Sequence, residues 1–361
     1  MNERLKAERA LLSPPGDDIL ETIKYQRISQ AELGKRLGKT PSKVHDIITG
    51  KEPITVNTAL KLEKVLSISA QFWLNRENNY REKITRLEQE EFLESCKGWL
   101  REQPIKQLKE CGYLKSHEVG TSMVEETLQF YGVASPEQWE LIYIKEYTLA
   151  SYRKSIAHKD ALASMAAFLR IGEIEMKKME LPEFDKVAFK STLQKIRQLA
   201  AKHPASFKNK LQQLSSEAGV AVVYTRCLPK APVSGATRWI GNNPLIQLTD
   251  RYKTADHFWF TFFHEAGHVL LHGKKDVFIE EFEGYKPDSK KETEANEFAT
   301  KWLLPEEFVA DLPENFTEED VIKIAKKYKT DPGIVVGRLQ HLKLVSFSFG
   351  NNLKRKVNLF Y

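Results

Sequence analysis

The sequence predicts a mainly α-helical protein, with an all-α helix-turn-helix near its N-terminus and a small α+β domain near its C-terminus. Three observations predict this class. Two short capped helices flank a glycine turn in residues 29–50, a β-branched run lies at residues 220–224, and an apolar helix occupies residues 257–272. A chain of 361 residues is expected to form two or three domains.

The composition is that of a globular protein, with 41% hydrophobic and 29% charged residues. The net charge of +6 permits contact with nucleic acid and fits a solvated Lys/Glu surface equally well. Three cysteines, with no pair at metal-ligand spacing, favour a reducing cytoplasm. No stretch approaches the roughly 18 apolar residues of a membrane span, and the N-terminus lacks a signal-peptide core. We therefore expect a cytoplasmic protein with no membrane partner.

Capping residues define the two N-terminal helices. Ser29 is the expected N-cap of the first helix, and Gly38 follows its end. Thr40 is the expected cap of the second helix, with Pro41 at its first position and Gly50 as its stop. Two capped helices around a glycine turn predict a helix-turn-helix.

The second helix of such a motif enters the major groove of DNA, so its outward-facing residues are candidate contacts. Val44, Ile47 and Ile48 should face the core. The candidate DNA-binding residues are Ser42, Lys43, His45 and Asp46, together with Gln30 on the preceding helix and Lys39, which with Lys43 and Lys51 would contact phosphates. The alternative is a small helical bundle used for dimerisation or partner binding.

Longer motifs around these helices resemble a known family. Residues 50–55 (Gly-Lys-Glu-Pro-Ile-Thr), 58–62 (Thr-Ala-Leu-Lys-Leu) and 72–75 (Phe-Trp-Leu-Asn) are similar to the DNA-binding domain of HigA-type antitoxins, within the Xre-like regulators. Where family members carry Leu-Gln after Trp-Leu-Asn, this chain has Arg76-Glu77. The resemblance implies double-stranded operator DNA as a partner, admits a cognate toxin, and leaves room for a homodimer.

The expected domain organisation follows from these motifs and from breaks in composition. Residues 1–13 are expected to be a tail, and the charge run at 354–356 to be solvated. The expected segments are a helix-turn-helix domain at 14–80, a helical connector at 81–204, a C-terminal α+β domain at 205–345 and a second tail at 346–361.

The C-terminal domain should contain two strands before its apolar helix. Residues 220–224 predict a buried strand, and residues 245–249 alternate with period two, which suits one face on the core and one toward a cleft. Residues 234–237 are expected to form a polar turn between them. Residues 245–249 are expected either to bind an extended peptide as an added strand or to be a plain core strand.

The apolar helix carries His264-Glu265-Ala-Gly-His268. Positions four apart share a helix face, so the two imidazoles can bind one zinc ion, and Glu265 beside them could take a proton from a water molecule. The alternative is a core helix whose histidines are only hydrogen-bonded. His272 continues the face of His268, and could orient substrate, stabilise an oxyanion or cap the helix.

A catalytic zinc ion needs a third protein ligand. Residues 291–305 predict a second amphipathic helix, and Glu294 borders its buried stripe. We therefore choose Glu294 as the third ligand, with Glu292 and Glu297 as alternatives.

These two helices are similar to the ImmA/IrrE family of zinc metallopeptidases. The resemblance rests on the helix at 263–272, on Glu294-Ala-Asn-Glu-Phe-Ala and on Leu303-Leu-Pro, and covers about residues 205–345. It implies a zincin-like peptidase fold, with His264, His268 and Glu294 as zinc ligands and Glu265 as general base. It also implies transcriptional repressors as substrates.

The favoured hypothesis is a cytoplasmic, DNA-binding zinc metallo-endopeptidase that cleaves a repressor or related regulatory protein. The main alternative is a non-proteolytic, antitoxin-like regulator whose zinc domain is a sensor or a scaffold for a toxin. A third hypothesis has the peptidase covered by residues 81–204 until it is activated.

Overall fold

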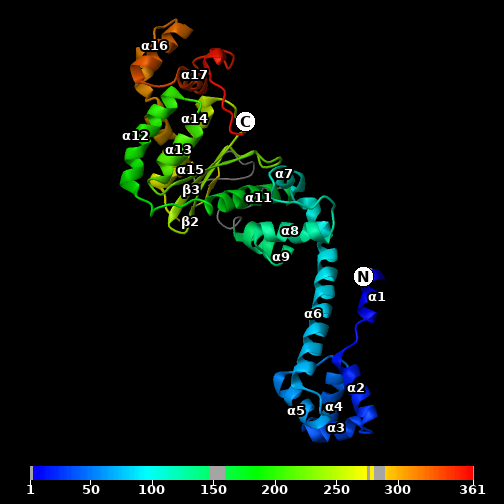
Figure 1. Cartoon of the computed structure of the whole chain (residues 1–361). Helices are drawn as coiled ribbons and strands as arrows, with labels where there is room; N and C mark the ends of the chain where they lie inside the picture. The colour runs from blue at the N-terminus through cyan, green and yellow to red at the C-terminus, as the bar shows by residue number, and fades with distance from the viewer. Residues whose placement is uncertain (1–2, 147–158, 275–276, 280–288, 361) are drawn as a thin grey trace. The chain divides into compact units, whose positions relative to one another are not determined.

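The computed structural model describes residues 3–146, 159–274, 277–279 and 289–360 (Figure 1). The chain divides into two compact units, residues 1–98 with 116–125 and residues 99–115 with 126–361. Helices dominate both, and the four-stranded sheet lies in the second unit. The predicted fold class, mainly α with a small α+β region, is confirmed. None of the described helices combines the length and apolar character needed to cross a membrane.

The first unit is built on an all-α core. Its helices are α1 (Glu3–Ala10), α2 (Pro15–Tyr25), α3 (Gln30–Leu37), α4 (Pro41–Ile48), α5 (Val56–Leu66) and α6 (Ala70–Ser95). Helices α2 to α5 pack their apolar faces together around Trp73 at the start of α6, whose indole is fully buried. The predicted Val44, Ile47 and Ile48 all lie in this core.

The predicted caps are confirmed. The hydroxyl of Ser29 accepts a hydrogen bond from the Glu32 amide at 3.1 Å, and that of Thr40 accepts one from the Lys43 amide at 3.4 Å. Gly38 ends α3 with φ of 63°, a left-handed conformation that glycine adopts without strain. Local capping therefore fixes both helices of the helix-turn-helix.

Residues 3–13, within the tail expected at 1–13, pack against the first unit. Leu5 of α1 is fully buried, and Arg9 forms a 2.9 Å ion pair with Glu88 of α6. After this helix, Gly16 lies so close to α4 that a Cβ would come 1.8 Å from the Ile48 carbonyl oxygen. The N-terminal residues thus extend the first unit by packing.

The expected domain end at residue 80 falls inside a helix. Helix α6 continues from Ala70 to Ser95, and the departure from the HigA pattern at Arg76-Glu77 lies on it. Arg76 pairs with Asp18 of α2 at 2.7 Å, and buried Glu77 pairs with Arg81 at 2.5 Å. The Arg76–Asp18 pair ties α6 to α2, and Arg81, just beyond the predicted boundary, donates a hydrogen bond to the Gly50 carbonyl at 2.6 Å.

The second unit carries the sheet. Its strands are β1 (Ala221–Thr225), β2 (Gly235–Ile240), β3 (Asn243–Thr249) and β4 (Phe278–Ile279), in the order β1-β3-β2-β4. Between α6 and the sheet lie η1 (Cys96–Glu102), α7 (Ile105–Glu110), α8 (Thr121–Tyr131), α9 (Pro136–Trp139), η2 (Glu140–Glu146), α11 (Lys159–Met176), α12 (Lys186–Lys202) and α13 (Phe207–Ser216). The later helices are α14 (Ala255–Leu271), α15 (Ser289–Leu303), η3 (Glu306–Asp311), α16 (Glu318–Tyr328), α17 (Pro332–His341) and η4 (Asn351–Leu353).

Strand β3 is the centre of this sheet. It pairs in parallel with β1, Ala221 opposite Leu245, and antiparallel with β2, Gly235 opposite Leu248. The polar turn expected at residues 234–237 is therefore wrong, because β2 begins at Gly235. Tertiary contacts decide this: Thr237 is buried and donates a hydrogen bond to the Glu265 carbonyl of α14 at 3.2 Å.

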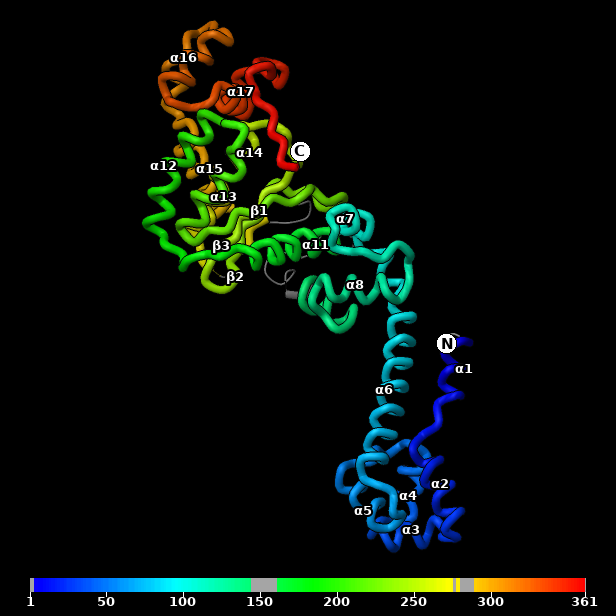
Figure 2. Tube along the Cα trace, in the orientation of Figure 1, coloured from blue at the N-terminus to red at the C-terminus, as the bar shows by residue number. Residues whose placement is uncertain are grey.

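Helices cover both faces of the sheet (Figure 2). Val222, Ile246 and Leu248 share a core with α12, α13 and α14. The opposite face, with Leu245, packs on Met176 of α11. On that face the buried Gln247 donates a hydrogen bond to the Phe168 carbonyl of α11 at 2.6 Å. The second face of residues 245–249 therefore meets a helix, and the cleft expected there is absent from the described residues.

Two segments expected to be peripheral belong to the core of the second unit. Helix α12, within the expected connector, contributes Phe189 and Leu193, and the expected C-terminal tail contributes Val357 and Leu359. Nor is the charge run at 354–356 fully solvated, because the Lys354 side chain is only 9% exposed and pairs with Asp256 of α14 at 2.6 Å. The core is thus completed by residues from both sides of the predicted domain.

Candidate metal centre and nucleic-acid interface

Helix α14 positions the two histidines of the motif. It is buried along nearly its whole length, and His264 and His268 lie one turn apart on it, each almost fully buried. Gly267 lets α15 approach, since a Cβ there would come 3.3 Å from the Ala295 Cα. This close packing brings acidic side chains of α15 to the histidines.

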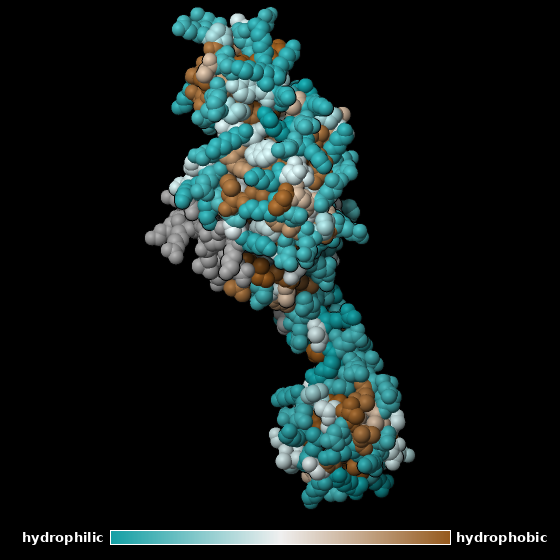
Figure 3. Space-filling view, turned by 90° about the vertical axis from the view of Figure 1, so that its left-hand side faces the viewer, coloured by the Kyte–Doolittle hydropathy of each residue, from teal (hydrophilic) through white to brown (hydrophobic). Residues whose placement is uncertain are grey.

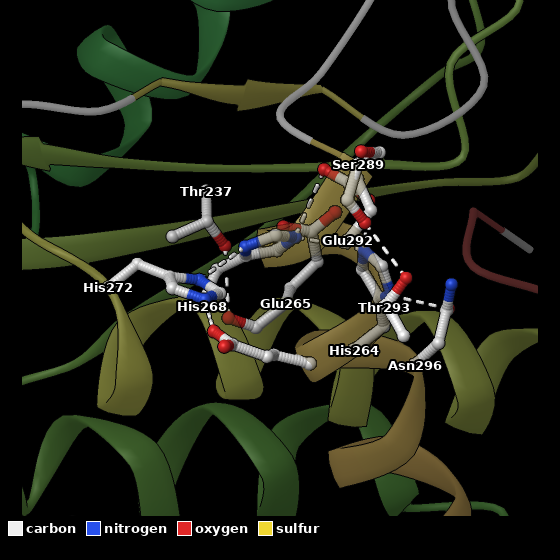
Figure 4. A network of polar contacts seen from close by, with 10 residues as sticks. Thr237, His264, Glu265, His268, His272, Ser289, Glu292, Thr293 and Asn296 are labelled. Carbon is white, nitrogen blue, oxygen red and sulfur yellow. Dashed lines mark hydrogen bonds and ion pairs between the residues drawn. The ribbon is translucent and has the colours of Figure 1, made fainter.

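The histidines and one carboxylate converge on a single point (Figure 4). The Nε2 atoms of His264 and His268 are 2.9 Å apart. Glu292 of α15 places one carboxylate oxygen 3.2 Å from the His264 Nε2 and the other 3.5 Å from the His268 Nε2. Ligand atoms of these three residues all lie within 4.8 Å of one another.

Glu294, the third ligand chosen from the sequence, lies elsewhere. Its carboxylate contacts the His272 Nε2 at 3.1 Å, and its side chain is 43% exposed. Two positions apart on a helix are about 200° apart around its axis, so α15 can turn only one of the two glutamates toward the histidine pair. The structure brings Glu292, one of the two alternatives, to the histidine pair, while Glu297 is exposed.

Each histidine is held through its other ring nitrogen. The Nδ1 of His264 lies 2.9 Å from the Asn296 Oδ1, which accepts its proton. The Nδ1 of His268 lies 2.9 Å from the Nδ1 of His272, whose Nε2 faces Glu294. In one arrangement of protons, Glu294 accepts a hydrogen bond from the His272 Nε2, and the His272 Nδ1 accepts one from the His268 Nδ1. The Nε2 atoms of His264 and His268 then both carry a lone pair on the side of Glu292.

His272 therefore contacts a histidine ligand candidate rather than the open side of the site. It also ends α14, with its amide donating to the His268 carbonyl at 3.1 Å, while its ring contacts the side chains of His268 and Glu294. Asn296, by contrast, was missed as a site residue. Its position four residues after Glu292, on the same face of α15, was the available signal.

Electrostatics favour the metal-binding protonation states. Burial lowers the pKa of His268 to about 4, against the favourable contact with Glu292. In the alternative tautomer, in which the Nε2 atoms carry the protons, burial favours the neutral form of Glu292, but hydrogen bonds donated by His264 and His268 outweigh it and lower its pKa to about 2. At neutral pH the site presents a neutral His268 imidazole and a Glu292 carboxylate.

This donor set fits zinc. Zinc in catalytic sites takes two or three imidazole nitrogens with a carboxylate oxygen, and ligating histidines usually donate their second N–H to an oxygen or another partner. Two lone pairs facing each other at 2.9 Å would repel, and a shared cation removes that repulsion. His264, His268 and Glu292 are therefore the residues suited to hold it.

Glu265 lies beside this centre, beneath strand β2. It is fully buried, and a Cβ at Gly235 would come 2.7 Å from its Oε1, so glycine at 235 leaves room for this carboxylate. On the other side, Phe278 of β4 stacks on His268, with ring centroids 3.8 Å apart. Strands β2 and β4 thus wall the site.

The candidate DNA-contacting residues lie on α3, α4 and the turn between these helices. Gln30, Ser42, Lys43 and His45 are exposed and Asp46 is half-buried. Lys39 differs, because its amino group lies 3.3 Å from Glu52 and its side chain is only 16% exposed. Lys43 also pairs with Glu52, at 3.8 Å, but its side chain is 60% exposed. Two of the six candidates, Lys39 and Lys43, thus share Glu52 as an ion-pair partner.

Comparison with known proteins agrees with both regions. A peptidase family described as the IrrE N-terminal-like domain matches residues 216–340, and the helix-turn-helix family matches residues 23–73. The chain is 36% identical over 64 residues to the uncharacterised HTH-type transcriptional regulator YddM of Escherichia coli (strain K12), covering 18% of this chain and 68% of that relative. An addiction module antidote protein of the HigA family from Coxiella burnetii is 27% identical, with 24% of this chain and 88% of that chain covered and a TM-score of 0.19.

Proposed function

Because this chain belongs to the helix-turn-helix transcriptional regulators and carries an IrrE-like peptidase domain, we propose that it is a cytoplasmic, DNA-binding zinc metallo-endopeptidase. Its substrate would be a transcriptional repressor or a related regulatory protein, with a cognate toxin as the other candidate partner. The observation that carries the proposal is the convergence of His264, His268 and Glu292 next to Glu265.

His264, His268 and Glu292 would hold a zinc ion, which when bound would supply a Lewis acid for the substrate carbonyl and for a water molecule. Glu265 accepts the proton of that water and passes it to the leaving amine. Asn296 and His272 hold the two imidazoles with their Nε2 lone pairs toward the ion. Burial of Glu265 keeps bulk water from competing for its proton.

The sheet limits where a substrate backbone can bind. Residues 245–249 cannot add a peptide strand, because β3 is already paired on both sides. Strand β4 pairs with β2 alone among the described strands, and its Phe278 lies against His268. We place an extended substrate along β4, where strand addition would bring its backbone to the centre.

The test is a Glu265→Gln variant assayed against the repressor or toxin encoded next to its gene. The variant should bind zinc as well as the wild type, and cleavage should fall by about 100-fold to 10,000-fold, the usual effect of losing a general base. Glu297→Gln, an exposed glutamate of α15, is the matched control and should cleave normally. Cleavage that persists in Glu265→Gln would contradict the mechanism.

Burial of the centre favours a second candidate, a regulator that does not cleave proteins. Glu265 is fully buried, and His264 and His268 are 2% and 1% exposed. A domain of this kind would sense zinc or bind a partner while the helix-turn-helix binds operator DNA. Salt-dependent binding to its own promoter, with no cleavage of any co-encoded protein, would favour this candidate.

A further inference from the structure

A cavity of about 520 Å³ lies in the second unit beside the candidate metal centre. Helix α14 forms one wall, and α15 and α17, which both pack on α14, contribute others. Phe260 and Thr261 of α14 line it, four positions before His264 and Glu265, which is about 6 Å along the helix axis. The volume falls within the range of about 300–1,000 Å³ that ligand-binding sites occupy.

Two contacts connect the cavity wall to the metal centre. The ring centroids of Phe260 and His264 are 6.4 Å apart. A Cβ at Gly235 would come 2.7 Å from the Thr261 Cγ2 and 2.7 Å from the Glu265 Oε1, so these two atoms lie against the same glycine. Thr261 therefore borders both the cavity and the proposed general base.

An extended polypeptide bound at the centre brings its side chains within reach of this cavity. Successive residues of an extended chain advance by about 3.3 Å. The cavity wall lies about 6 Å along α14 from the histidine and the glutamate of the centre, so a side chain one or two residues from the scissile bond spans the gap. The cavity is thus placed to receive a substrate side chain next to the bond that is cleaved.

The chemistry of the walls favours an apolar side chain. Most of the lining is apolar and includes Phe260, Leu303, Leu304, Ile334 and Phe347. An apolar cavity of about 150 Å³ already holds a benzene ring, so this larger one accommodates an aromatic side chain. Such a side chain buries about 150–250 Å² of its surface, which makes a large contribution to affinity.

Charge on the walls disfavours a basic side chain. Arg338, Lys343 and Lys354 line the cavity, against the single lining carboxylate of Asp256 among the described residues. Lys354 pairs with Asp256 at 2.6 Å, and Arg338 pairs with Glu306 at 2.6 Å. A lysine or arginine side chain of the substrate would be buried beside like charge, with the one lining carboxylate already paired, which is costly.

We propose that this cavity is the specificity pocket of the metal centre and receives a large apolar or aromatic side chain next to the scissile bond of the protein substrate. The inference rests on the proposed peptidase function, because it concerns a polypeptide bound at that centre. It narrows the substrates to regulatory proteins that carry a residue such as leucine, methionine or phenylalanine at this position. Small and basic residues there are poor substrates.

The test uses zinc-binding probes, so that it measures binding rather than cleavage. Succinyl hydroxamate with a benzyl side chain, and the same compound without it, are titrated calorimetrically into the full-length, zinc-loaded protein. The benzyl compound should bind about 10-fold to 100-fold more tightly, the effect of burying one aromatic side chain. An aminobutyl side chain should give no gain. Equal affinities of the benzyl and unsubstituted compounds, an equal gain from aminobutyl, or no binding of any probe would overturn the proposal.

Two variants of α15 locate the specificity pocket. Thr300 lines the cavity, whereas the neighbouring Lys301 is exposed and lies outside the lining. Thr300→Trp should fill the cavity and remove the preference for benzyl while the unsubstituted compound binds as before, a pattern that unfolding does not produce. Lys301→Trp is the matched control and should keep the full preference. A preference that survives Thr300→Trp would place the side chain elsewhere and overturn the proposal.

Failure of this inference is distinguishable from failure of the proposed function. Affinity for the hydroxamates does not require cleavage. A benzyl preference in a protein that cleaves no co-encoded protein would therefore contradict the peptidase mechanism and support the pocket. Cleavage together with equal affinities for the benzyl and unsubstituted compounds would contradict the pocket alone.

Discussion

The helix-turn-helix and the candidate metal centre are assembled by contacts of different range. In the first, the Ser29 hydroxyl caps a helix by bonding the amide three residues later, and each helix begins and ends at residues of its own segment. In the second, His264 is oriented by Asn296, 32 residues along the chain and on another helix. Helix formation in the first region is local, whereas the second region requires α14 and α15 to pack.

This difference has a consequence for how each region fails. Losing a cap weakens one helix without changing the side chains on the surface of the first unit. In Figure 3 that surface is mostly hydrophilic, with an apolar patch. Losing a contact between α14 and α15 removes a candidate zinc ligand or the side chain that orients it, because no other described residue takes its place in the site. Substitutions that change one region and leave the other intact would confirm this comparison.

The largest expected effect separates the two glutamates of α15. Glu294→Gln removes only the partner of His272, and should weaken zinc affinity by about 10-fold to 100-fold. Glu292→Gln removes a proposed ligand, and should weaken zinc affinity by more than that. Competition with a chromophoric zinc chelator measures both.

The exposed Glu297→Gln is the control and should bind zinc normally. If Glu294→Gln lost more affinity than Glu292→Gln, Glu294 would be the ligand after all.

Acid should destabilise the metal-free second unit more than the first. The folded-state pKa of His268, about 4, lies below the 6.5 of an unfolded histidine, so stability is full above pH 6.5 and is lost as the pH falls toward 4. By pH 5 this amounts to about 2 kcal/mol. His203, whose pKa burial also lowers to about 4, adds less because it is only partly buried.

Hydrogen exchange measured at α14 and α4, at pH 7 and pH 5 in the presence of chelator, tests this prediction. In the wild type, protonation of His203 competes with the hydrogen bond that the Trp259 indole donates to its Nδ1. A His203→Gln variant lacks this competition, so hydrogen exchange at α14 should change less between pH 7 and pH 5. Equal loss of protection in α4 and α14 would contradict the comparison.

A smaller effect is expected from the cap of α4. Thr40→Ala removes the acceptor of the Lys43 amide, and should cost about 1 kcal/mol of stability in the first unit. Chemical denaturation followed by the fluorescence of Trp73, buried in that core, would report it, with the other tryptophans replaced. Zinc affinity should not change, and a change there would mean that the two regions are coupled.

The smallest effect concerns DNA. Lys43→Ala should weaken operator binding a few-fold and reduce the slope of log affinity against log salt by about 0.9, the loss of one phosphate contact. Lys39→Ala should change the slope less, because Lys39 is only 16% exposed and lies closer to their shared partner Glu52 than the 60% exposed Lys43 does. Lys24 of α2 provides an exposed control lysine, and equal slopes for Lys43→Ala and Lys24→Ala would remove α4 from the interface.

Much of the fold was predictable where neighbours in sequence decide it. The caps at Ser29 and Thr40, the turn at Gly38 and the strand after Gly219 were all predicted. Strand β2 was not, because Gly235 and Thr237 have turn-like chemistry, and only burial against α14 makes them a strand. The peripheral segments were misjudged for the same reason, since Lys354 and Val357 are buried by residues far away in the sequence.

By itself the sequence determined the helix-turn-helix and the pair His264 and His268, because capping and the four-residue spacing act within one helix. Only the tertiary structure decided which glutamate of α15 meets that pair. Glu292 and Glu294 are equivalent as residue types, and the rotation of α15 against α14, set by Gly267 and Ala295, turns Glu292 toward the imidazoles and Glu294 toward His272. A helix fixes spacing along its own axis, whereas packing fixes which face it presents.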